Sequence, residues 1–477
     1  MPAVRTALMC RTGTRLVVAA LAGSLLLSAC TGGEDPPEPG PSPEASSAGP
    51  ERTELRLTVF GTRAQQQSYA DVARAYEQVD PDVDVVTTGY RTAPAALRAV
   101  ESGEEPADVF LMDGSALAEL TTRSPDFLQP LDELLEERDV QFGDDHQRVA
   151  LSALSAEAAL QCMPAEMSPT VLYADDALLP SNRRLRSLGV ELPRAIETWG
   201  WNEFAATARA VAVADGPAGM RGVYVPPTLQ LMTAFVRAAG GDVVDDVAEP
   251  RELDLTSDEA LQVLRLVAVL AADRSVSLTP QQVAEKSALQ RFVDGELGLM
   301  FGTRADVPVL RESGREFQVL PLPGFGRSRS VSTVSGYCVP ASSDEVELAA
   351  DFIAWAVGQE GATTAARRGA LVPARLDVLS SEAFTQPRRL PANYRVYVDG
   401  VRRSEPLPDT PKWTALNRRA DRVLEQVLTD PTVDLGVALP LRMEALARQT
   451  ERLLAPEETE EPEESGSPEP SETPSEG

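Results

Sequence analysis

The sequence predicts an α/β fold in which strands and helices alternate around a doubly wound, mainly parallel sheet. Between Leu55 and Thr122, β-rich segments and segments with helical periodicity follow one another as strand, helix, strand, helix, strand, helix. That order is typical of a parallel sheet with helices on both faces. The chain has 477 residues, which is room for two or three domains. We therefore expect the folded part to form two lobes.

The first strand expected is Leu55–Phe60, in which apolar and polar residues alternate. The next segment, Gln65–Val79, has apolar residues at helical spacing. It ends before Pro81, because a residue that precedes proline disfavours the helical conformation. Further strands are expected at 83–87, 107–112, 158–163 and 170–173, and further helices at 95–101 and 115–122.

Helices dominate the middle and the end of the chain. Thr256–Glu259 and Thr279–Gln282 each carry a hydroxyl residue followed three positions later by Glu or Gln, which indicates a helix start. Pro280 at the first turn agrees with this. The other helices are expected at 200–213, 229–239, 342–358, 412–428 and 441–454.

Two segments are expected to line and connect both lobes. Arg291–Arg304 predicts a helix that ends at Asp294-Gly295, a short buried strand over 297–301, and a turn at Gly302-Thr303. Ser335–Pro340 predicts a second apolar strand. Open α/β sheets bind ligands where strands end, and glycine lets a ligand approach the backbone. We therefore expect a ligand beside these two segments.

The N-terminus has the features of a targeting segment. Arg5, Arg11 and Arg15 precede the apolar run 16–27, which is too short to span a bilayer of about 30 Å. Leu27-Ser-Ala-Cys30 follows and resembles a bacterial lipobox. The resemblance implies that residues 1–30 are a lipoprotein signal and that Cys30 is diacylated, which is enough for stable anchoring at the extracytoplasmic face. The alternative is an ordinary secretory signal with an incidental cysteine.

The cysteine content fits an oxidising compartment. Cys10 is lost with the signal and Cys30 is lipidated, which leaves Cys162 and Cys338 in short apolar strands. Outside the cytoplasm such a pair is expected to form a disulfide. The alternative is two buried free thiols that act as small apolar residues.

Both ends of the folded part are flanked by polar segments. Residues 31–53 are rich in Pro, Glu, Ser and Gly and predict a disordered tether. Residues 455–477 predict an acidic disordered tail, with contact to cell-wall polymers or cations as the alternative. The net charge of −29 argues against nucleic acid as a partner and against electrostatic binding to anionic lipid.

The sequence carries few signals of catalysis. His146 is the only histidine and lies in a polar segment, without the Gly-x-Ser-x-Gly pattern of a hydrolase. The numbers of Cys and His argue against a usual zinc site, and no phosphate-binding Gly-rich loop is present. We expect no metal, no cofactor and no enzyme activity, although acidic pairs leave a glycosidase as a minor alternative.

The order of several motifs, taken with the lipobox and the doubly wound lobe, resembles a known family. The motifs are Pro164 before Val171–Tyr173, Thr198–Phe204, Ala238–Asp245, Phe292–Gly302, Val319–Pro323, Ser335–Tyr337 and Arg368–Pro373. Together they resemble extracellular solute-binding proteins of ABC importers, in the sugar-binding class that includes maltose-binding protein. The resemblance covers roughly residues 54–454.

The resemblance implies a periplasmic-binding-protein-like fold of two α/β lobes joined by crossing hinge strands. Carried over, the N-lobe is 54–160 plus 341–385, and the C-lobe with the hinge strands is 161–340 plus 386–454. The crossings fall near 160–166, 334–340 and 386–411. This places Cys162 and Cys338 on neighbouring hinge strands and strengthens the expectation of a disulfide.

The resemblance also implies which residues face the ligand. Each has a structural alternative as a helix cap, a surface charge or a core residue. The ligand-binding residues implied are Thr62, Arg63, Asp113, Glu166, Tyr224, Arg304, Gly336, Tyr337 and Trp413.

The sequence departs from the family at the cleft. Arg304 stands where sugar binders often present an aromatic ring, and Met112 where Trp is common. Because an Arg fork binds carboxylate or phosphate well, an acidic or smaller ligand is an alternative to a sugar.

The function expected is a monomeric, membrane-anchored protein that captures a small solute, such as a sugar or oligosaccharide, and delivers it to the transmembrane subunits of an ABC permease. The alternative is a non-transport envelope lipoprotein, a sensor or scaffold, on the same fold.

Overall fold

The structure is a computed structural model that describes residues 52–455 apart from residues 105, 194–198, 214–216, 248 and 409. The predicted signal peptide, the lipidation site Cys30 and the acidic tail from residue 456 onward lie outside the described residues, as does the tether up to residue 51. Thr53, the predicted last residue of the tether, already belongs to the first strand. Within the described range, the helices lack the length and apolar character needed to cross a membrane.

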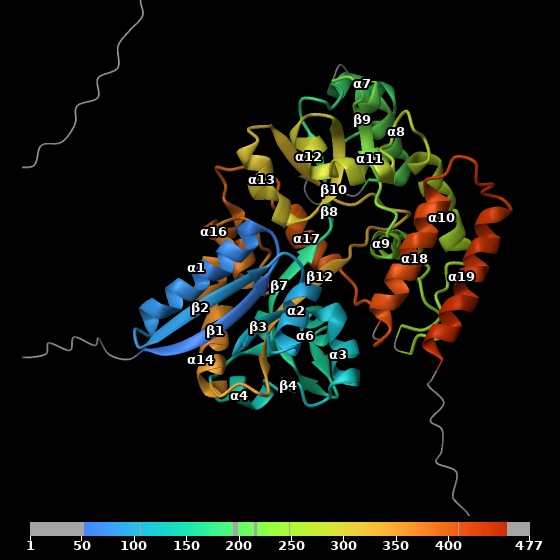
Figure 1. The fold of residues 1–477 in the computed structure, drawn as a ribbon. Coiled ribbons are helices and arrows are strands. Elements are labelled where there is room, and N and C mark those ends of the chain that lie inside the picture. The colour runs from blue at the N-terminus through green and yellow to red at the C-terminus, as the bar shows by residue number, and fades with distance from the viewer. Residues whose placement is uncertain are drawn as a thin grey trace, which may run out of the picture. The chain divides into compact units, whose positions relative to one another are not determined.

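The first lobe is built on a six-stranded sheet, seen in the lower part of Figure 1. Its strands are β1 (Thr53–Phe60), β2 (Val83–Tyr90), β3 (Val109–Asp113), β4 (Leu128–Gln129), β7 (Cys162–Pro169) and β12 (Ser332–Pro340). The order is β2-β1-β3-β12-β4, and β7 also pairs with β12. β1 runs parallel to β2 and β3, which confirms the predicted parallel core of this lobe. β12 runs antiparallel to its neighbours.

The first helix, α1 (Arg63–Val79), shows how local signals place the helices of this lobe. The Thr62 hydroxyl accepts a hydrogen bond from the Gln65 backbone amide at 3.3 Å and so caps the helix. Its buried residues include Tyr69 and Tyr76, as the periodicity predicted. The other short elements of the lobe are α2 (Ala93–Glu101), η1 (Gly114–Ala116), α3 (Leu117–Arg123), α4 (Asp132–Glu136), α5 (Phe142–Asp145), α6 (Arg148–Ser152), β5 (Ser155–Ala156), β6 (Ala159–Leu160), α14 (Val346–Val357) and α15 (Gln359–Ala366).

The second lobe is built on a four-stranded sheet that is mixed rather than mainly parallel. Its strands are β8 (Val171–Asp175), β9 (Arg221–Tyr224), β10 (Leu297–Gly302) and β11 (Phe317–Leu320), in the order β11-β8-β10-β9. β10 is parallel to β9, but β8 is antiparallel to β10 and β11. The prediction of a mainly parallel sheet is wrong here. The reason is that β8 enters from the first lobe directly after β7, so its direction is set by that crossing.

Helices cover this sheet and form the side of the lobe. They are α7 (Asn182–Ser187), α8 (Trp201–Ala212), α9 (Leu229–Ala239), α10 (Asp258–Ala271), α11 (Pro280–Glu285), α12 (Ala288–Val293), η2 (Arg304–Asp306), α13 (Val307–Glu312), α18 (Trp413–Leu428) and α19 (Ala438–Leu454). The predicted capping box at Thr279 is present. At α10 the cap is Ser257 rather than Thr256. α12 ends at Asp294-Gly295 as predicted, with Gly295 in the left-handed region at φ 75°.

The first crossing between the lobes lies further along the chain than expected, and the second lies slightly earlier. β7 and β12 pair with each other over most of their length, and β12 also pairs with β3. Both strands therefore belong to the sheet of the first lobe, and the first two crossings fall near Thr170 and Val331. The predicted lobe boundaries at 160 and 341 therefore differ from the observed crossings. The reason is that β7 and β12, which were expected to be hinge strands, are hydrogen-bonded into the sheet of the first lobe.

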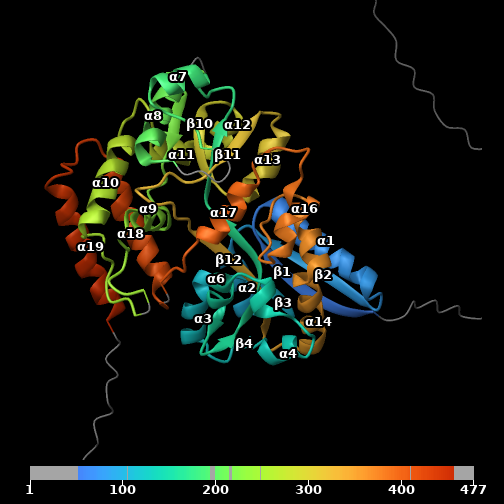
Figure 2. The ribbon, with the colours of Figure 1, turned by 180° about the vertical axis from the view of Figure 1, so that it is seen from behind.

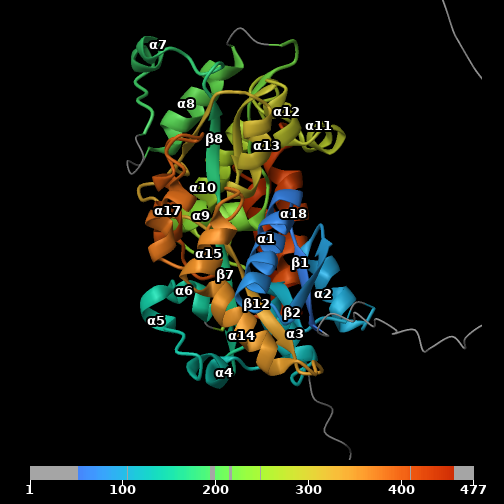
Figure 3. The ribbon, with the colours of Figure 1, turned by 90° about the vertical axis from the view of Figure 1, so that its left-hand side faces the viewer.

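A connecting segment closes one side of the junction between the lobes. It contains η3 (Asp377–Ser380), α16 (Glu382–Thr385) and α17 (Arg395–Arg403). α17 packs against β7 of the first lobe and β8 of the second. Figures 1 and 2 show α17 at the level where the lobes meet, and Figure 3 shows it from the side.

Cys162 and Cys338 form a disulfide, as the sequence predicted. They lie directly opposite each other on β7 and β12, with their Cα atoms 4.4 Å apart. The bond therefore joins two neighbouring strands of the first sheet, at the end of their pairing that lies away from Thr170 and Val331.

The apolar core has three main parts. One lies in the first lobe around β1 and α1, and another in the second lobe around α9, α10 and α18. The third contains residues of both lobes, including Phe110 of β3, Tyr173 of β8 and Tyr397 of α17. The lobes are thus packed together through apolar side chains on the side of the connecting segment.

Candidate functional site

A cavity of about 500 Å³ lies between the lobes, on the side of α18. Two other cavities are far smaller, at about 20 and 10 Å³. The first lobe contributes the end of β3, η1, the α6–β5 region and the start of β12, and the second contributes the start of α9, the segment before α18, and α18 itself. We name it the cleft cavity. Its described lining residues are Asp113–Ser115, Leu117, Ala118, Val149, Ser152, Ala153, Ser155, Ala156, Met167, Thr228, Gln230, Val247, Ser332–Val334, Ser404–Pro408, Thr410, Trp413, Asn417 and Asp421.

One face of α18 forms a continuous wall of the cleft cavity. Trp413, Asn417 and Asp421 lie four residues apart, so they project from the same side of the helix. The Asn417 side-chain amide donates to the Trp413 carbonyl oxygen at 3.1 Å. Asp421 Oδ1 accepts from the backbone amide of Leu229 at 2.7 Å, which fixes the start of α9 against α18. Burial raises the pKa of Asp421.

The first lobe faces this wall with the end of β3. Asp113 Oδ1 accepts two hydrogen bonds from Ser115, one from the backbone amide at 2.9 Å and one from the hydroxyl at 2.6 Å. Burial raises the pKa of Asp113, and the two hydrogen bonds oppose that shift without reversing it. Asp113 thus caps η1 and also lines the cavity, so its structural role as a cap is compatible with a place in the cavity wall.

The segment before α18 closes the floor of the site. The hydroxyls of Ser404 and Ser332 lie 2.6 Å apart and join this segment to β12. The Glu405 carboxylate pairs with Arg329 at 2.6 Å and lies 3.9 Å from Arg237. Its charge is therefore balanced by arginines. Among the described lining residues of the cavity there is no Lys, Arg or His.

Of the nine predicted ligand-binding residues, the structure brings only Asp113 and Trp413 into the wall of the cleft cavity. Thr62 caps α1 and Arg63 is exposed at its first turn. Tyr224, at the end of β9, is partly buried against the core shared by the two lobes, and burial raises its pKa to about 12. Thr62 is thus occupied by capping and Tyr224 by packing, whereas Arg63 points to solvent outside the cleft cavity.

Glu166 is buried in a cluster of its own, which we name the glutamate cluster. The Tyr69 hydroxyl donates to Glu166 Oε2 at 3.2 Å, and the Gln65 amide lies 3.3 and 3.4 Å from the two carboxylate oxygens. Burial raises the pKa of Glu166 to about 7. Its carboxylate is thus held by α1 rather than by a surface arginine or the cavity.

Gly336 and Tyr337 serve packing inside the first lobe. Tyr337 is 2 % exposed, and its ring meets those of Tyr69 and Phe352 edge-on at 6.1 and 5.9 Å. A Cβ at Gly336 would lie 2.4 Å from Leu154 Cδ1 and 2.8 Å from the Met163 oxygen. Glycine is therefore required there by the close approach of β7, without any ligand.

Arg304 is packed in what we name the arginine cluster. It is 1 % exposed, and its guanidinium carbon lies 4.1 Å from the ring centre of Phe384 and 4.9 Å from that of Tyr397. Its Nη2 donates to the Phe384 carbonyl oxygen at 2.5 Å. Burial lowers its pKa. The predicted anion-binding role does not fit this position, because the rings of the connecting segment already cover the guanidinium.

Most of the polar residues of the cavity wall were not predicted from the sequence. Asn417 and Asp421 share helical spacing with Trp413, so the expected helix and its tryptophan were a usable signal. Thr228 and Gln230 lie at the start of the predicted helix 229–239, where side chains and backbone amides face outward. The segment 404–410 and the α6–β5 region carried no such signal.

The described residues contain no group of His, Cys, Asp and Glu side chains that could hold a metal ion. His146, predicted in a polar loop, is 2 % exposed, and burial lowers its pKa to about 4. A buried, neutral imidazole of this kind is a structural residue of the first lobe.

The two-lobe fold and the cavity between the lobes define a class of ligand-binding proteins. Residues 71–392, more than half of the chain, match the family model described as bacterial extracellular solute-binding protein. The chain belongs to this family, whose members are binding proteins located outside the cytoplasm. Among curated protein sequences, none matches the chain.

Solved structures share the fold at low sequence identity. The ABC substrate-binding protein Lmo0181 from Listeria monocytogenes, in complex with cycloalternan, has a TM-score of 0.71 and 17% identity, over 83% of this chain and 99% of that one. The GacH receptor of Streptomyces glaucescens has a TM-score of 0.69 and 18% identity, over 84% and 98%. Maltose-bound MalE3 of T. maritima has a TM-score of 0.68 and 18% identity, over 84% and 100%. These similarities confirm the predicted two-lobe fold.

Proposed function

We propose that the protein captures an oligosaccharide in the cleft cavity and delivers it to an ABC permease. The observation that carries the proposal is the composition of the cavity wall, which joins one tryptophan to a row of hydroxyl and amide side chains from both lobes. A sugar offers hydroxyl groups for the polar side chains, and an apolar ring face for the part of Trp413 that borders the cavity. Trp413 is 3 % exposed and otherwise packs in the core of the second lobe. The volume of about 500 Å³ lies within the roughly 300–1,000 Å³ typical of small-molecule sites.

The solved relatives support a saccharide. Their structures hold cycloalternan in Lmo0181, acarbose in the GacH receptor and maltose in MalE3. Because sequence identity is low, these ligands support only the class of solute. Which saccharide is bound depends on the residues of this chain.

Delivery follows from the way a two-lobe site binds. A ligand that contacts Asp113 and Ser115 on one wall and Trp413 and Asn417 on the other stabilises the arrangement in which the walls are close. A permease then distinguishes the loaded protein from the empty one. In this proposal the protein acts as a monomer without turnover, and the lipid on Cys30 keeps it at the outer surface of the membrane.

Calorimetric titration of the full chain in detergent with maltotriose, cellotriose and their larger homologues tests solute capture. We expect saturable binding to at least one of them. Trp413→Phe should weaken that binding about 10-fold, because a smaller ring covers less of the sugar face. Trp355→Phe is the matched control, since Trp355 packs against Tyr76 in the first lobe at 5.6 Å and does not line the cavity.

The absence of binding to every saccharide tested would overturn the proposal and favour the sensor or scaffold role. Equal loss of affinity in both tryptophan variants would place the ligand outside the cleft cavity.

A separate experiment tests the lipid anchor. Cys30→Ser should move the protein from the membrane fraction to the medium, whereas retention in the membrane would contradict lipidation at that residue.

A further inference from the structure

The cleft cavity has an unbalanced negative charge. Its described lining residues include three carboxylates, Asp113, Glu405 and Asp421, and no cationic side chain. Glu405 is balanced by Arg329 at 2.6 Å. Asp113 and Asp421 form no ion pair in the described part of the chain. The site therefore has two carboxylates whose charge the described residues do not neutralise.

Each of these two carboxylates keeps one oxygen free of hydrogen bonds to the described residues. The hydrogen bonds from Ser115 go to Asp113 Oδ1, and the bond from the Leu229 amide goes to Asp421 Oδ1. The Oδ2 atoms accept none of the hydrogen bonds in the described structure, and neither Oδ2 is among the buried atoms without a partner. They are thus accessible acceptors at the wall of the cavity.

The two carboxylates belong to opposite walls. Asp113 ends β3 of the first lobe, and Asp421 lies on α18 of the second. α18 packs against η1, the turn that Asp113 caps, so the two walls are held close at this point. Like charges on facing walls disfavour the approach of the lobes, and an anionic ligand would add to that repulsion. A cation placed between them would remove it.

We propose that the solute is a saccharide that carries a protonated amine, with its ammonium group held by Asp113 and Asp421. This inference rests on the proposed function, since it narrows the class of saccharide that the cleft cavity takes. Ser115, Asn417 and Gln230 supply hydrogen bonds for the hydroxyls. Trp413 borders the same wall but is 3 % exposed and packed in the core of the second lobe, so the two carboxylates carry the recognition of the cation. The negative charge of the cavity disfavours the acidic ligand considered from the sequence. Arg304, which was expected to bind such a ligand, lies in the arginine cluster outside the cavity.

The experiment compares trisaccharides that differ in charge. The full chain in detergent is titrated calorimetrically with chitotriose, whose amines are free, and with triacetylchitotriose, whose amines are blocked. Maltotriose and trigalacturonate complete the series as neutral and anionic probes. We expect chitotriose to bind about 10-fold or more tightly than its acetylated form, as for a charge-assisted contact. Raising NaCl from about 20 to about 500 mM should weaken chitotriose binding more than maltotriose binding.

Three variants locate the charge effect. Asp113→Asn and Asp421→Asn each keep an oxygen that can accept the existing hydrogen bonds from Ser115 or Leu229, so the fold should hold. Each should weaken chitotriose binding about 10-fold and weaken maltotriose binding by a smaller factor. Asp84→Asn is the control, because Asp84 is an exposed aspartate on β2, outside the cavity. Thermal unfolding of each variant checks that the fold is intact.

The outcomes separate this inference from the proposed function. Tighter binding of chitotriose that depends on Asp113 and Asp421 supports it. Equal or tighter binding of the neutral trisaccharides overturns it and leaves oligosaccharide capture standing. Preference for trigalacturonate also overturns it. Failure of all four probes overturns both the amine inference and the proposed function.

Discussion

The cleft cavity and the arginine cluster lie on different sides of the junction between the lobes, and both combine an aromatic ring with a charged group. Beside Trp413, the Asp421 carboxylate is partly exposed at a cavity of about 500 Å³. Beside Phe384 and Tyr397, Arg304 is 1 % exposed and has no room for a ligand. The difference is that the connecting segment fills the side of the junction at Arg304 and leaves the side at α18 open. An aromatic ring beside a charged group is therefore not enough to identify the side of the junction that binds a ligand.

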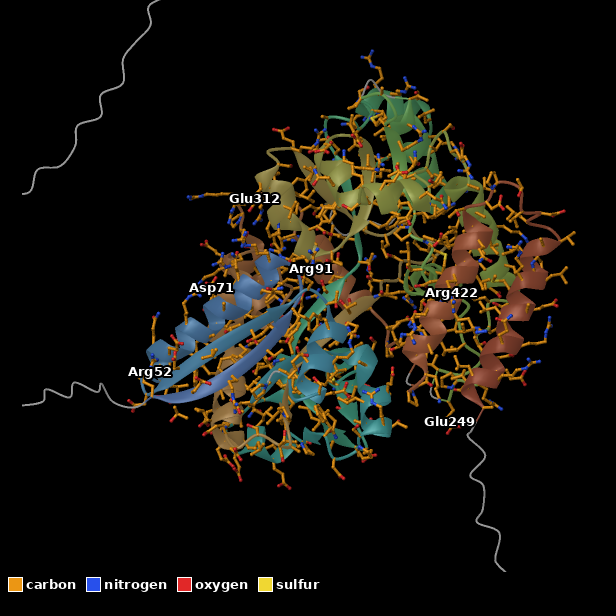
Figure 4. All side chains as sticks on the ribbon, viewed as in Figure 1. Arg52, Asp71, Arg91, Glu249, Glu312 and Arg422 are labelled. Atoms are coloured by element: carbon orange, nitrogen blue, oxygen red, sulfur yellow. A yellow bond between two sulfur atoms is a disulfide. The ribbon has the colours of Figure 1, made fainter. Side chains whose placement is uncertain are left out.

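The largest effect should come from Arg304→Ala. Removal of this buried side chain leaves a gap beneath Phe384 and Tyr397 and should lower the free energy of unfolding by about 3 kcal/mol. Urea unfolding measures this loss, and saccharide affinity of the folded protein should stay within 2-fold. Arg422→Ala is the control, because Arg422 is exposed on α18 and labelled in Figure 4. It should change stability by less than about 0.5 kcal/mol.

A second variant separates packing from charge in the arginine cluster. Arg304→Met keeps an apolar chain of similar length and should be close to neutral in stability, because a buried charge is removed with little loss of packing. A loss of saccharide binding in Arg304→Met would show that the guanidinium reaches the ligand. That result would contradict the interpretation that the arginine cluster is packed core and only the cleft cavity binds the ligand.

The glutamate cluster should make stability depend on pH. The pKa of Glu166 is raised to about 7 in the folded protein from an ordinary value of 4.5. The folded state therefore binds the proton more tightly, and the contribution of this group is present below pH 4.5 and lost as the pH rises through 7. Its size is on the order of 3 kcal/mol. In urea unfolding at pH 5 and pH 8, Glu166→Gln should lose less stability between the two values than the natural protein does. Equal losses in the two proteins would show that Glu166 is not held protonated.

Asn417→Ala tests whether the wall of the cleft cavity contributes to binding rather than to stability. The loss of one hydrogen bond to the ligand should weaken saccharide binding about 5-fold, with a small change in stability. Asn393→Ala is the matched variant on the packed side, where the amide donates to the Val319 carbonyl oxygen at 3.2 Å. It should lower stability and leave affinity unchanged. The opposite result would contradict the contrast: calorimetry would show weaker saccharide binding in Asn393→Ala, and urea unfolding would show lower stability in Asn417→Ala. The ligand would then bind on the side of the connecting segment.

The smallest effect is expected for Arg63→Ala. Arg63 is exposed at the first turn of α1, and the cap of this helix is made by Thr62. Affinity for saccharides and for trigalacturonate should change less than 2-fold, because the side chain lies outside the cleft cavity. A selective loss of trigalacturonate binding would restore the anionic ligand considered from the sequence.

Local patterns in the sequence were enough to predict many of the helices and strands and the class of fold. The alternation of strand and helix before residue 122, the capping box at Thr279 and the glycine turn after α12 each depend on neighbouring residues, so local rules were sufficient. The disulfide was also predictable, because compartment and composition left only Cys162 and Cys338 to pair. The order of motifs then indicated the solute-binding family.

The division between the lobes and the set of residues that reach the cavity depend on contacts between distant parts of the chain. β12 joins the first sheet through pairing with β3 and β7, which are distant in the chain. Glu166, Arg304 and Tyr337 follow family motifs but are buried by α1 and the connecting segment. Asp421 reaches the cavity because α18 lies against α9. Such contacts between distant segments depend on how the elements pack, and no local pattern in the sequence contains that information.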